Sequence, residues 1–307
     1  MTIKRTLLAS VLTLAAGTAS ATSIGVTMTS FDNPFLTILL NGMKEQAAAS
    51  GVELQLEDAK LDVGRQLDQV QSFIATGVDA IIVNAVDGDS TVSITQQARE
   101  AGIPLIYANH PPADVDKLPE LASFVGSNEL DSGTLQTQEV CRLLGGKGDV
   151  LVLIGPLENH AAHTRTKDIE QVISSADCNG MKIVDKQVAN WSRTEAYDRM
   201  TNWLTEGLRF DAVIANNDEM AIGAIQAMKA GGVDMKKVVV AGIDATPDGL
   251  KSMQDGDLDI TVFQNATAQG MESVKAAIAM SKKQPTERNI WVPFELVTPS
   301  NIKNYIH

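Results

Sequence analysis

The chain has 307 residues, of which 44% are hydrophobic and 21% charged, and its mean hydropathy is -0.01. This composition excludes a disordered chain, and the length is enough for two domains. The 38 acidic and 25 basic side chains give a formal net charge of -13, which argues against a broad nucleic-acid-binding face, because phosphate groups require clustered Lys and Arg.

The first 21 residues show the three parts of a secretory signal peptide. Lys4 and Arg5 form a positive start, residues 7–16 form an apolar core too short to span a bilayer, and Ala19-Ser20-Ala21 is a small-residue cleavage motif. An ordinary first strand or core helix is the alternative. We expect cleavage after Ala21, and no later apolar run approaches the ~20 residues of a transmembrane helix. Export without a second anchor predicts a periplasmic protein.

Short apolar and β-branched runs then alternate with stretches of helical periodicity. Most of these runs are continuously apolar, as in strands of a parallel sheet that helices cover on both faces. The strands predicted in this way are residues 23–28, 52–56, 80–83, 104–107, 124–126, 150–154, 182–184, 212–215 and 238–242.

The stretches between the runs carry apolar stripes and end signals of helices. One stripe comprises Phe35, Leu36, Leu39, Leu40, Met43 and Ala47, and another comprises Ala196, Tyr197, Met200, Trp203 and Leu204. Start signals are Ser90, Asp131 and Asp218, which precede helices ending at or near residues 101, 144 and 230, and the predicted C-cap glycines are Gly51, Gly77, Gly102 and Gly231.

This alternation predicts an α/β fold with two doubly wound parallel-sheet lobes. No Pro- or Gly-rich linker separates the two series, so we expect a tight hinge. Residues 255–307 do not continue the alternation, which suggests a chain that crosses back between lobes rather than the last unit of a single TIM barrel, the competing fold. The predicted lobes are residues 22–127 with 265–294, and residues 128–264 with 295–307.

Polar and aromatic side chains follow most of the predicted strands. In open α/β sheets ligands bind at the carboxyl ends of the strands, so two facing lobes would enclose these groups in one cleft. Amides and charged groups suit vicinal hydroxyls, and flat rings stack on the apolar faces of a saturated ring, so the pattern predicts a carbohydrate or polyol site. The side chains are Asn33, Phe35, Asn109, His110, His163, Arg165, Trp191, Asn217, Asp218 and Asp244.

Three segments in the same order resemble the type I periplasmic binding proteins, and above all their ribose-binding branch. They are Ser-Phe-Asp-Asn-Pro-Phe at 30–35, Ala-Asn-Asn-Asp-Glu-Met-Ala-Ile-Gly-Ala at 215–224 and Gly-Ile-Asp-Ala-Thr-Pro-Asp-Gly at 242–249. The resemblance implies a hinged, monomeric protein without a cofactor that closes around a sugar or related polyol and delivers it to an ABC-transporter permease. The alternative is an exported ligand-sensing subunit for a chemoreceptor or sensor kinase, which the sequence does not separate from the transport role.

The family's ligand contacts can be carried over residue by residue. They match Asn33, Phe35, Arg165, Trp191, Asn217 and Asp244, with Gln264 at the crossing between lobes.

Four positions depart from the family pattern. Asn109-His110 replaces an Asp-Arg pair after the fourth strand, Leu36 replaces a second aromatic residue, and His163 replaces the first arginine of Arg-x-Arg. These changes weaken an assignment to ribose, so an inositol-like polyol or an amino- or methyl-substituted ring fits at least as well. Arg165 near a helix start opposes the helix dipole and requires an anion or a ligand beside it.

Structural roles compete with ligand binding at several of these positions. Phe35 could belong to the core, whereas Trp191 lies in a turn, where a large aromatic residue favours ligand stacking. Of the neighbours Asn217 and Asp218, we assign the helix cap to Asp218 and ligand binding to Asn217. Asp244 could also cap the helix that follows it, and His110 could be only a surface residue.

Enzymatic and DNA-binding functions lack their motifs. No nucleophile elbow, Walker motif, dinucleotide fingerprint or metal-ligand spacing occurs, and only Asp244 is placed in the cleft where a glycosidase needs two carboxylates. We therefore expect neither an enzyme nor a metal site. A sugar-responsive repressor would need a basic helix-turn-helix before residue 30, where the signal peptide lies.

The chain has two cysteines, Cys141 and Cys178. An oxidising compartment permits a disulfide between them, but spacing alone does not bring two Cα atoms within bonding range. A bridge and two separately buried thiols both remain open.

Overall fold

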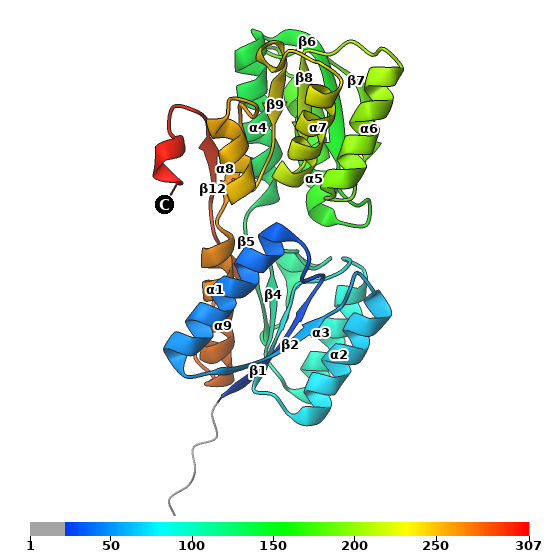
Figure 1. Ribbon diagram of the computed structural model, residues 1–307. Helices are drawn as coiled ribbons and strands as arrows, with labels where there is room; N and C mark the ends of the chain where they lie inside the picture. The colour runs from blue at the N-terminus through cyan, green and yellow to red at the C-terminus, as the bar shows by residue number, and fades with distance from the viewer. Residues whose placement is uncertain (1–21, 307) are drawn as a thin grey trace, which may run out of the picture.

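The structure is a computed structural model that describes residues 22–306, and it places them in two α/β lobes stacked end to end (Figure 1). The predicted signal peptide lies outside the described residues. Within them, no helix combines the length and apolar character needed to cross a membrane.

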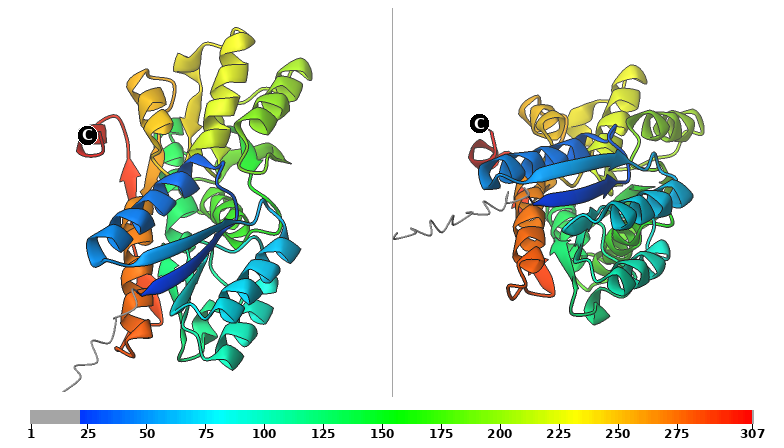
Figure 2. Two further views of the ribbon diagram at one scale, coloured as in Figure 1. Left: turned by 60° about the horizontal axis from the view of Figure 1, so that its bottom comes forward. Right: turned by 90° about the horizontal axis from the view of Figure 1, so that it is seen from below.

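The first lobe is built on a six-stranded parallel sheet. Helices α1 (Pro34–Ser50) and α9 (Ala266–Ser281) lie side by side on one face, and α2 (Val63–Thr76) and α3 (Ser90–Ala101) cover the other (Figure 1; Figure 2). In sheet order the strands are β11 (Asn289–Trp291), β5 (Ala122–Gly126), β4 (Leu105–Ala108), β3 (Ala80–Val83), β1 (Ser23–Met28) and β2 (Glu53–Asp58).

Burial on both faces explains the continuously apolar strands. Successive side chains of a strand point to opposite faces. In β3, Ile82 packs in the core that includes Leu39 of α1, whereas Ile81 and Val83 pack in the core that includes Phe73 of α2. A polar residue at any of these positions would be buried, so the strand carries none.

The second lobe repeats this plan with a four-stranded parallel sheet. Helices α4 (Glu129–Leu144) and α5 (His160–Ile173) share one core with the sheet, and α6 (Arg193–Thr205), α7 (Asp218–Ala230) and α8 (Pro247–Gln254) share the other. Two open sheets confirm the doubly wound prediction and exclude a single TIM barrel. The strands, in sheet order, are β7 (Gly180–Val188), β6 (Lys147–Ile154), β8 (Ala212–Ala215) and β9 (Val239–Ala241).

Three segments of the chain connect the lobes. They lie between β5 and α4, between β10 (Thr261–Gln264) and α9, and between β11 and β12 (Phe294–Val297). Strands β10 and β12 pair antiparallel beside the connections, which is why the C-terminal stretch breaks the earlier alternation. The limits of each lobe, at residues 127, 264 and 294, stay predictions.

Three predicted helix starts are wrong. Helix α3 already includes Ser90 and has Asp89 at its N-cap position. Helix α4 begins at Glu129, because Asn128 supplies its N-cap, and not after Asp131. Helix α7 is capped by Asn217, whose Oδ1 accepts from the backbone N–H of Met220 at 3.0 Å. The Asp218 carboxylate instead accepts from the Thr261 hydroxyl at 2.7 Å and from the backbone N–H of Thr246 at 2.9 Å, so it joins α7 to two neighbouring segments.

The glycine signals are mostly confirmed. Gly51, Gly77 and Gly102 end their helices with φ of 65°, 70° and 69°. Gly231 has φ of -79°, and the left-handed position falls on Gly232 with φ of 75°. Gly231 nevertheless follows the last residue of α7 at its C-cap, so the predicted end of this helix is confirmed without a left-handed φ at that residue.

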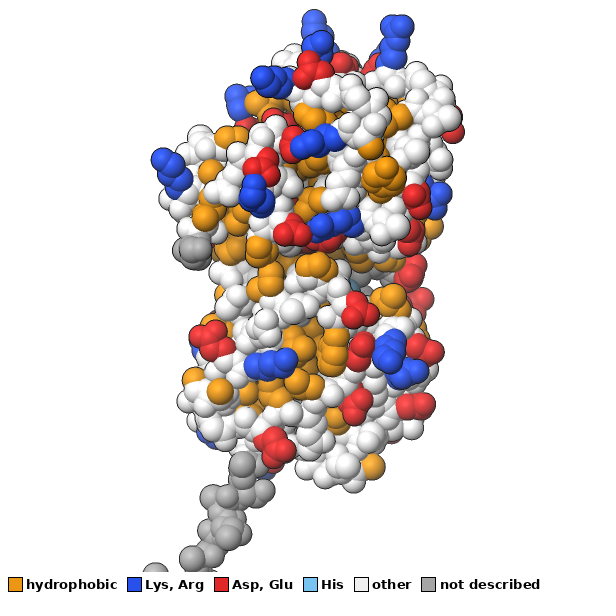
Figure 3. Space-filling model, in the orientation of Figure 1, with side chains coloured by type: hydrophobic (Ala, Val, Ile, Leu, Met, Phe, Trp, Pro, Cys, Tyr) orange, Lys and Arg blue, Asp and Glu red, His pale blue; other side chains and the backbone are white. Residues whose placement is uncertain are grey.

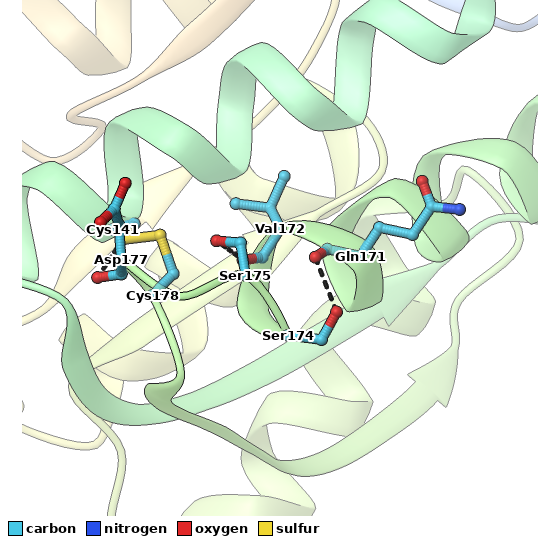
Figure 4. Close-up of a disulfide and its surroundings, with 7 residues drawn as sticks. All are labelled: Cys141, Gln171, Val172, Ser174, Ser175, Asp177 and Cys178. Atoms are coloured by element: carbon cyan, nitrogen blue, oxygen red, sulfur yellow. Dashed lines mark hydrogen bonds between the residues drawn. A yellow bond between two sulfur atoms is a disulfide. The ribbon is translucent and has the colours of Figure 1, made fainter.

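Cys141 and Cys178 form a disulfide, so the alternative of two thiols is excluded (Figure 4). Their Cα atoms lie 5.8 Å apart, within the usual range for a bridge. The bond ties the last turn of α4 to the segment between α5 and β7 and spans a sequence separation of 37.

Removing this bridge by the double substitution Cys141→Ser with Cys178→Ser should lower the free energy of unfolding by about 3 to 4 kcal/mol, because the unfolded chain gains the entropy of an open loop. Urea denaturation of the oxidised protein and the variant measures the difference. A reductant should cause a similar loss in the natural protein and none in the variant. Equal stability of all three forms would contradict the prediction.

Candidate functional site

A cavity of about 700 Å³ lies between the lobes, where the space-filling view shows the waist of the molecule (Figure 3). Its walls are made by the carboxyl ends of strands from both sheets, as the sequence predicts. All of the predicted ligand-binding residues line it, namely Asn33, Phe35, Asn109, His110, Arg165, Trp191, Asn217, Asp244 and Gln264.

Strand order explains the position of this cavity. In each sheet the chain reverses its winding direction beside the first strand, at β1/β3 and at β6/β8, and such switch points leave a crevice at the carboxyl ends. Helices α1 and α7 begin there, and Asn33 and Asn217 cap them with Oδ1. Neither Nδ2 group has a hydrogen-bond partner within residues 22–306, so both amides can donate into the cavity.

Several loops that line the cavity have a left-handed backbone at residues other than glycine. The φ angles are 67° at Asn109, 59° at Trp191 and 121° at Asp244. Such conformations cost on the order of 1–3 kcal/mol each and persist where the surrounding structure requires them. Asn109 directly follows β4, Asp244 is the third residue after β9, and both side chains line the cavity wall.

The guanidinium of Arg165 is the most extensively bonded group of the site. Its Nε donates to Glu129 Oε2 at 2.8 Å and its Nη2 to Glu129 Oε1 at 3.2 Å, while Nη1 donates to the Asn216 carbonyl at 2.8 Å. The anion that this position requires is therefore Glu129. Burial lowers the pKa of Arg165, but Glu129 and Asp244 outweigh burial and raise this pKa overall, so the side chain stays charged.

Two aromatic rings flank the same guanidinium. The Arg165 Cζ atom lies 5.6 Å from the ring centroid of Trp191 and 5.9 Å from that of Phe294. The Trp191 ring also covers Gly155, where a Cβ atom would lie 2.4 Å from the ring. A side chain at residue 155 would displace the ring, so the glycine at this position leaves the space that the Trp191 ring occupies in the cavity wall.

Asp244 is a buried carboxylate of the cavity wall that has no hydrogen-bond partner among the described residues. Its Oδ1 lies 3.9 Å from Arg165 Nη1, beyond hydrogen-bond distance. Burial raises its pKa well above the usual value, Arg165 opposes that shift, and Asp218 adds to it. An acceptor that is buried and unpaired in this way favours a ligand that brings hydroxyl donors.

The neighbours Asn109 and His110 face different groups. Asn109 donates from Nδ2 to Gln269 Oε1 of α9 at 3.1 Å. His110 Nδ1 lies 2.7 Å from the Ala85 carbonyl, and its Nε2 lies 3.4 Å from Asn159 Nδ2. Burial lowers the pKa of His110, so the ring is neutral at pH 7.

Two residues predicted at this edge do not line the cavity. His163 is exposed, and its Nε2 contacts the Leu157 carbonyl, because its position on α5 faces away from Arg165. Asp218 is fully buried beneath the cavity wall, where it bonds to Thr246 and Thr261.

The sequence interpretation missed several residues of the wall, among them Glu129, Asn159, Arg193 and Glu219. Arg193 and Glu219 form a bidentate pair with both N–O distances at 2.9 Å. Asn159 follows β6 and precedes α5, so its N-cap position was a usable signal. Glu129 follows β5 by three residues, but nothing local to it predicts that it pairs with Arg165.

Residues 24–285 match the family model of a periplasmic binding protein domain. The chain belongs to the periplasmic binding protein family. A relative from Rhizobium meliloti with the name "Putative rhizopine-binding protein" is 54% identical over 288 residues, which cover 94% of this chain and 93% of the relative. The ribose import binding protein of Salmonella typhimurium is 28% identical and covers 93% of each chain. The predicted likeness to the ribose-binding branch is thereby confirmed.

A solved structure shows the same architecture with a ligand. The ABC transporter solute binding protein from Bacillus halodurans, crystallised with bound myo-inositol, matches this binding protein with a TM-score of 0.88 and 43% identity, covering 94% of this chain and 98% of that one. The predicted fold is therefore confirmed over almost the whole length.

One buried carboxyl lies behind the site. Asp168 of α5 is 1% exposed, and its Oδ2 has no hydrogen-bond partner among the described residues. Burial, followed by the charges of Glu129 and Asp131, raises the pKa of Asp168 to about 7. Because this pKa exceeds its usual value of 3.8, folding favours the protonated form. The resulting stability is complete below about pH 4 and is lost as the pH rises through about 7.

The substitution Asp168→Asn should remove this loss. Relative to the natural protein, the variant should gain up to ~1.4 kcal/mol of unfolding free energy per pH unit between pH 5 and pH 7, because an amide has no proton to release. Urea denaturation at each pH measures the gain. As a control, Asp198→Asn on the exposed face of α6 should keep the natural profile. Parallel profiles for Asp168→Asn and the natural protein would refute the assignment.

Proposed function

We propose that this protein captures a cyclic polyol of the inositol type between its lobes and delivers it to an ABC-transporter permease. The observation that carries the proposal is the cavity itself, in which Phe35 from one lobe and Trp191 from the other share a space with the unpaired carboxylate of Asp244. The names of the relatives agree with this ligand class, since one is named for rhizopine and a structural neighbour holds myo-inositol.

The polar groups of the cavity suit ring hydroxyls, which both donate and accept. Donors without a partner among the described residues include the amide Nδ2 atoms of Asn33 and Asn217 and the buried Nε2 of Gln264. Gln264 is oriented because its Oε1 accepts from Arg165 Nη2 at 3.3 Å. Asp244 supplies the acceptor. A saturated ring would place its hydroxyls against these groups and its C–H faces against the aromatic rings.

Binding to both lobes couples the ligand to closure. A ligand that bonds to Asn33 in one lobe and to Asp244 in the other makes its full set of contacts only when the cleft is shut, so it shifts the population toward the closed form. The permease would recognise the closed pair of lobes. The monomeric state and the cleavage after Ala21 belong to the same proposal, and the family is one of periplasmic proteins.

The substitutions Asp244→Ala and Trp191→Ala should each weaken myo-inositol binding by about 10- to 100-fold, or ~1–3 kcal/mol. The first leaves buried hydroxyls without an acceptor, and the second removes a stacking face. Isothermal titration calorimetry measures both, after a thermal-shift screen of inositols, pentoses and hexoses has ranked the ligands.

Matched controls separate the site from general effects. Trp291 is 51% exposed and lies on β11 outside the cavity, so Trp291→Ala should bind as the natural protein does. Asp198→Ala should do the same. Undiminished affinity in both cavity variants would reject the site, and a screen in which only linear or aromatic compounds bind would reject the ligand class.

A further inference from the structure

His110 and Asn159 face each other across the cleft from different lobes. His110 lies in the loop after β4 of the first lobe, and Asn159 is the N-cap of α5 in the second. Their nearest nitrogen atoms, Nε2 and Nδ2, are 3.4 Å apart.

The first lobe fixes which atom His110 presents. Its Nδ1 lies 2.7 Å from the carbonyl of Ala85, a group that can only accept, so Nδ1 carries the proton. In the neutral ring Nε2 is therefore an acceptor, and it is the atom that faces the other lobe.

The second lobe fixes which atom Asn159 presents. Its Oδ1 accepts from the backbone N–H groups of Ala161 at 2.9 Å and Ala162 at 3.3 Å, as an N-cap does. This leaves the Nδ2 donor directed at His110. A donor and an acceptor are thus held opposite each other by separate lobes.

We propose that Asn159 is a positioning residue for lobe closure: its amide donates across the cleft to neutral His110, and protonation of His110 removes the acceptor and favours opening. This inference rests on the proposed function at one point, namely that closure of the lobes retains the ligand. The pair requires the two lobes to be close, so it stabilises the closed form whether or not a ligand is bound.

Burial is the main influence on the pKa of His110, because the charged groups around the ring act in opposite directions. Glu129 raises its pKa and Arg165 lowers it, and these two residues are paired with each other. Asp244 and the exposed Glu158 also line the cavity. The closed form therefore favours the neutral ring of His110. The stability that this ring gives to the closed form is complete above the ordinary histidine pKa of ~6.5 and is lost as the pH falls. Ligand affinity should fall by at most about tenfold per pH unit.

Two variants test the chemistry of the pair. Asn159→Asp keeps an N-cap oxygen but replaces the donor by a carboxylate, which repels the neutral acceptor and attracts protonated His110. The lobes of this variant should therefore close as the pH falls, whereas those of the natural protein should open. His110→Gln keeps a donor for Ala85 and an acceptor for Asn159 but does not titrate, so the opening of this variant should not depend on pH.

The readout is the distance between lobes in the protein without ligand. Spin labels on Ser72→Cys of α2 and Asn202→Cys of α6, both exposed, report this distance by electron–electron double resonance. The native cysteines are joined in the disulfide and do not take up label. From pH 8 to pH 5 the natural protein should open, Asn159→Asp should close, and His110→Gln should not change.

The outcomes distinguish this proposal from the function. Opening of Asn159→Asp in parallel with the natural protein, or a pH response retained in His110→Gln, would overturn the role of the pair even if myo-inositol binds. The reversed response together with no binding of any inositol would support the pair and reject the ligand class. Circular dichroism of each variant checks that it is folded at both pH values.

Discussion

The ion pair between Arg165 and Glu129 is the contact on which the geometry of the cleft depends. Glu129 follows the first connection between the lobes, Gln264 precedes the second, and Phe294 follows the third, and Arg165 touches all of them. Removing one member of a buried pair leaves an uncompensated charge, at a general cost of ~3–5 kcal/mol. The Arg165 side chain thereby links all three connections to the wall of the cavity.

The same pair decides the chemistry of the cavity. Because Glu129 takes both edges of the guanidinium, Asp244 at 3.9 Å is left without a direct partner. The cavity thus offers a buried carboxylate without a hydrogen-bond partner, several amide donors and two rings, while Arg165 and Arg193 on its wall are each paired with a glutamate. This combination suits a neutral, hydroxyl-rich ring better than an acidic sugar, whose carboxylate would meet Asp244.

Much of this arrangement could be predicted from the sequence because it follows from local rules. Apolar runs such as residues 80–83 and 212–215 were correctly predicted as strands, because burial on both faces of the sheet excludes polar residues from them. Residues that follow a parallel strand must lie at its carboxyl edge, so the predicted ligand contacts gather in one cavity. The same rule misplaced His163, because helix α5 turns that residue away from the edge toward solvent.

The sequence by itself determined the alternating elements, the two lobes and the kinds of side chain at the cleft, because periodicity and strand-end position act over a few neighbouring residues. Tertiary structure decided which groups those side chains bond to. The Cys141–Cys178 bond, the pairing of Arg165 with Glu129 and the use of Asp218 as a buried acceptor rather than a cap each join distant segments. Such contacts depend on how helices pack across a sheet, and no local pattern records that packing.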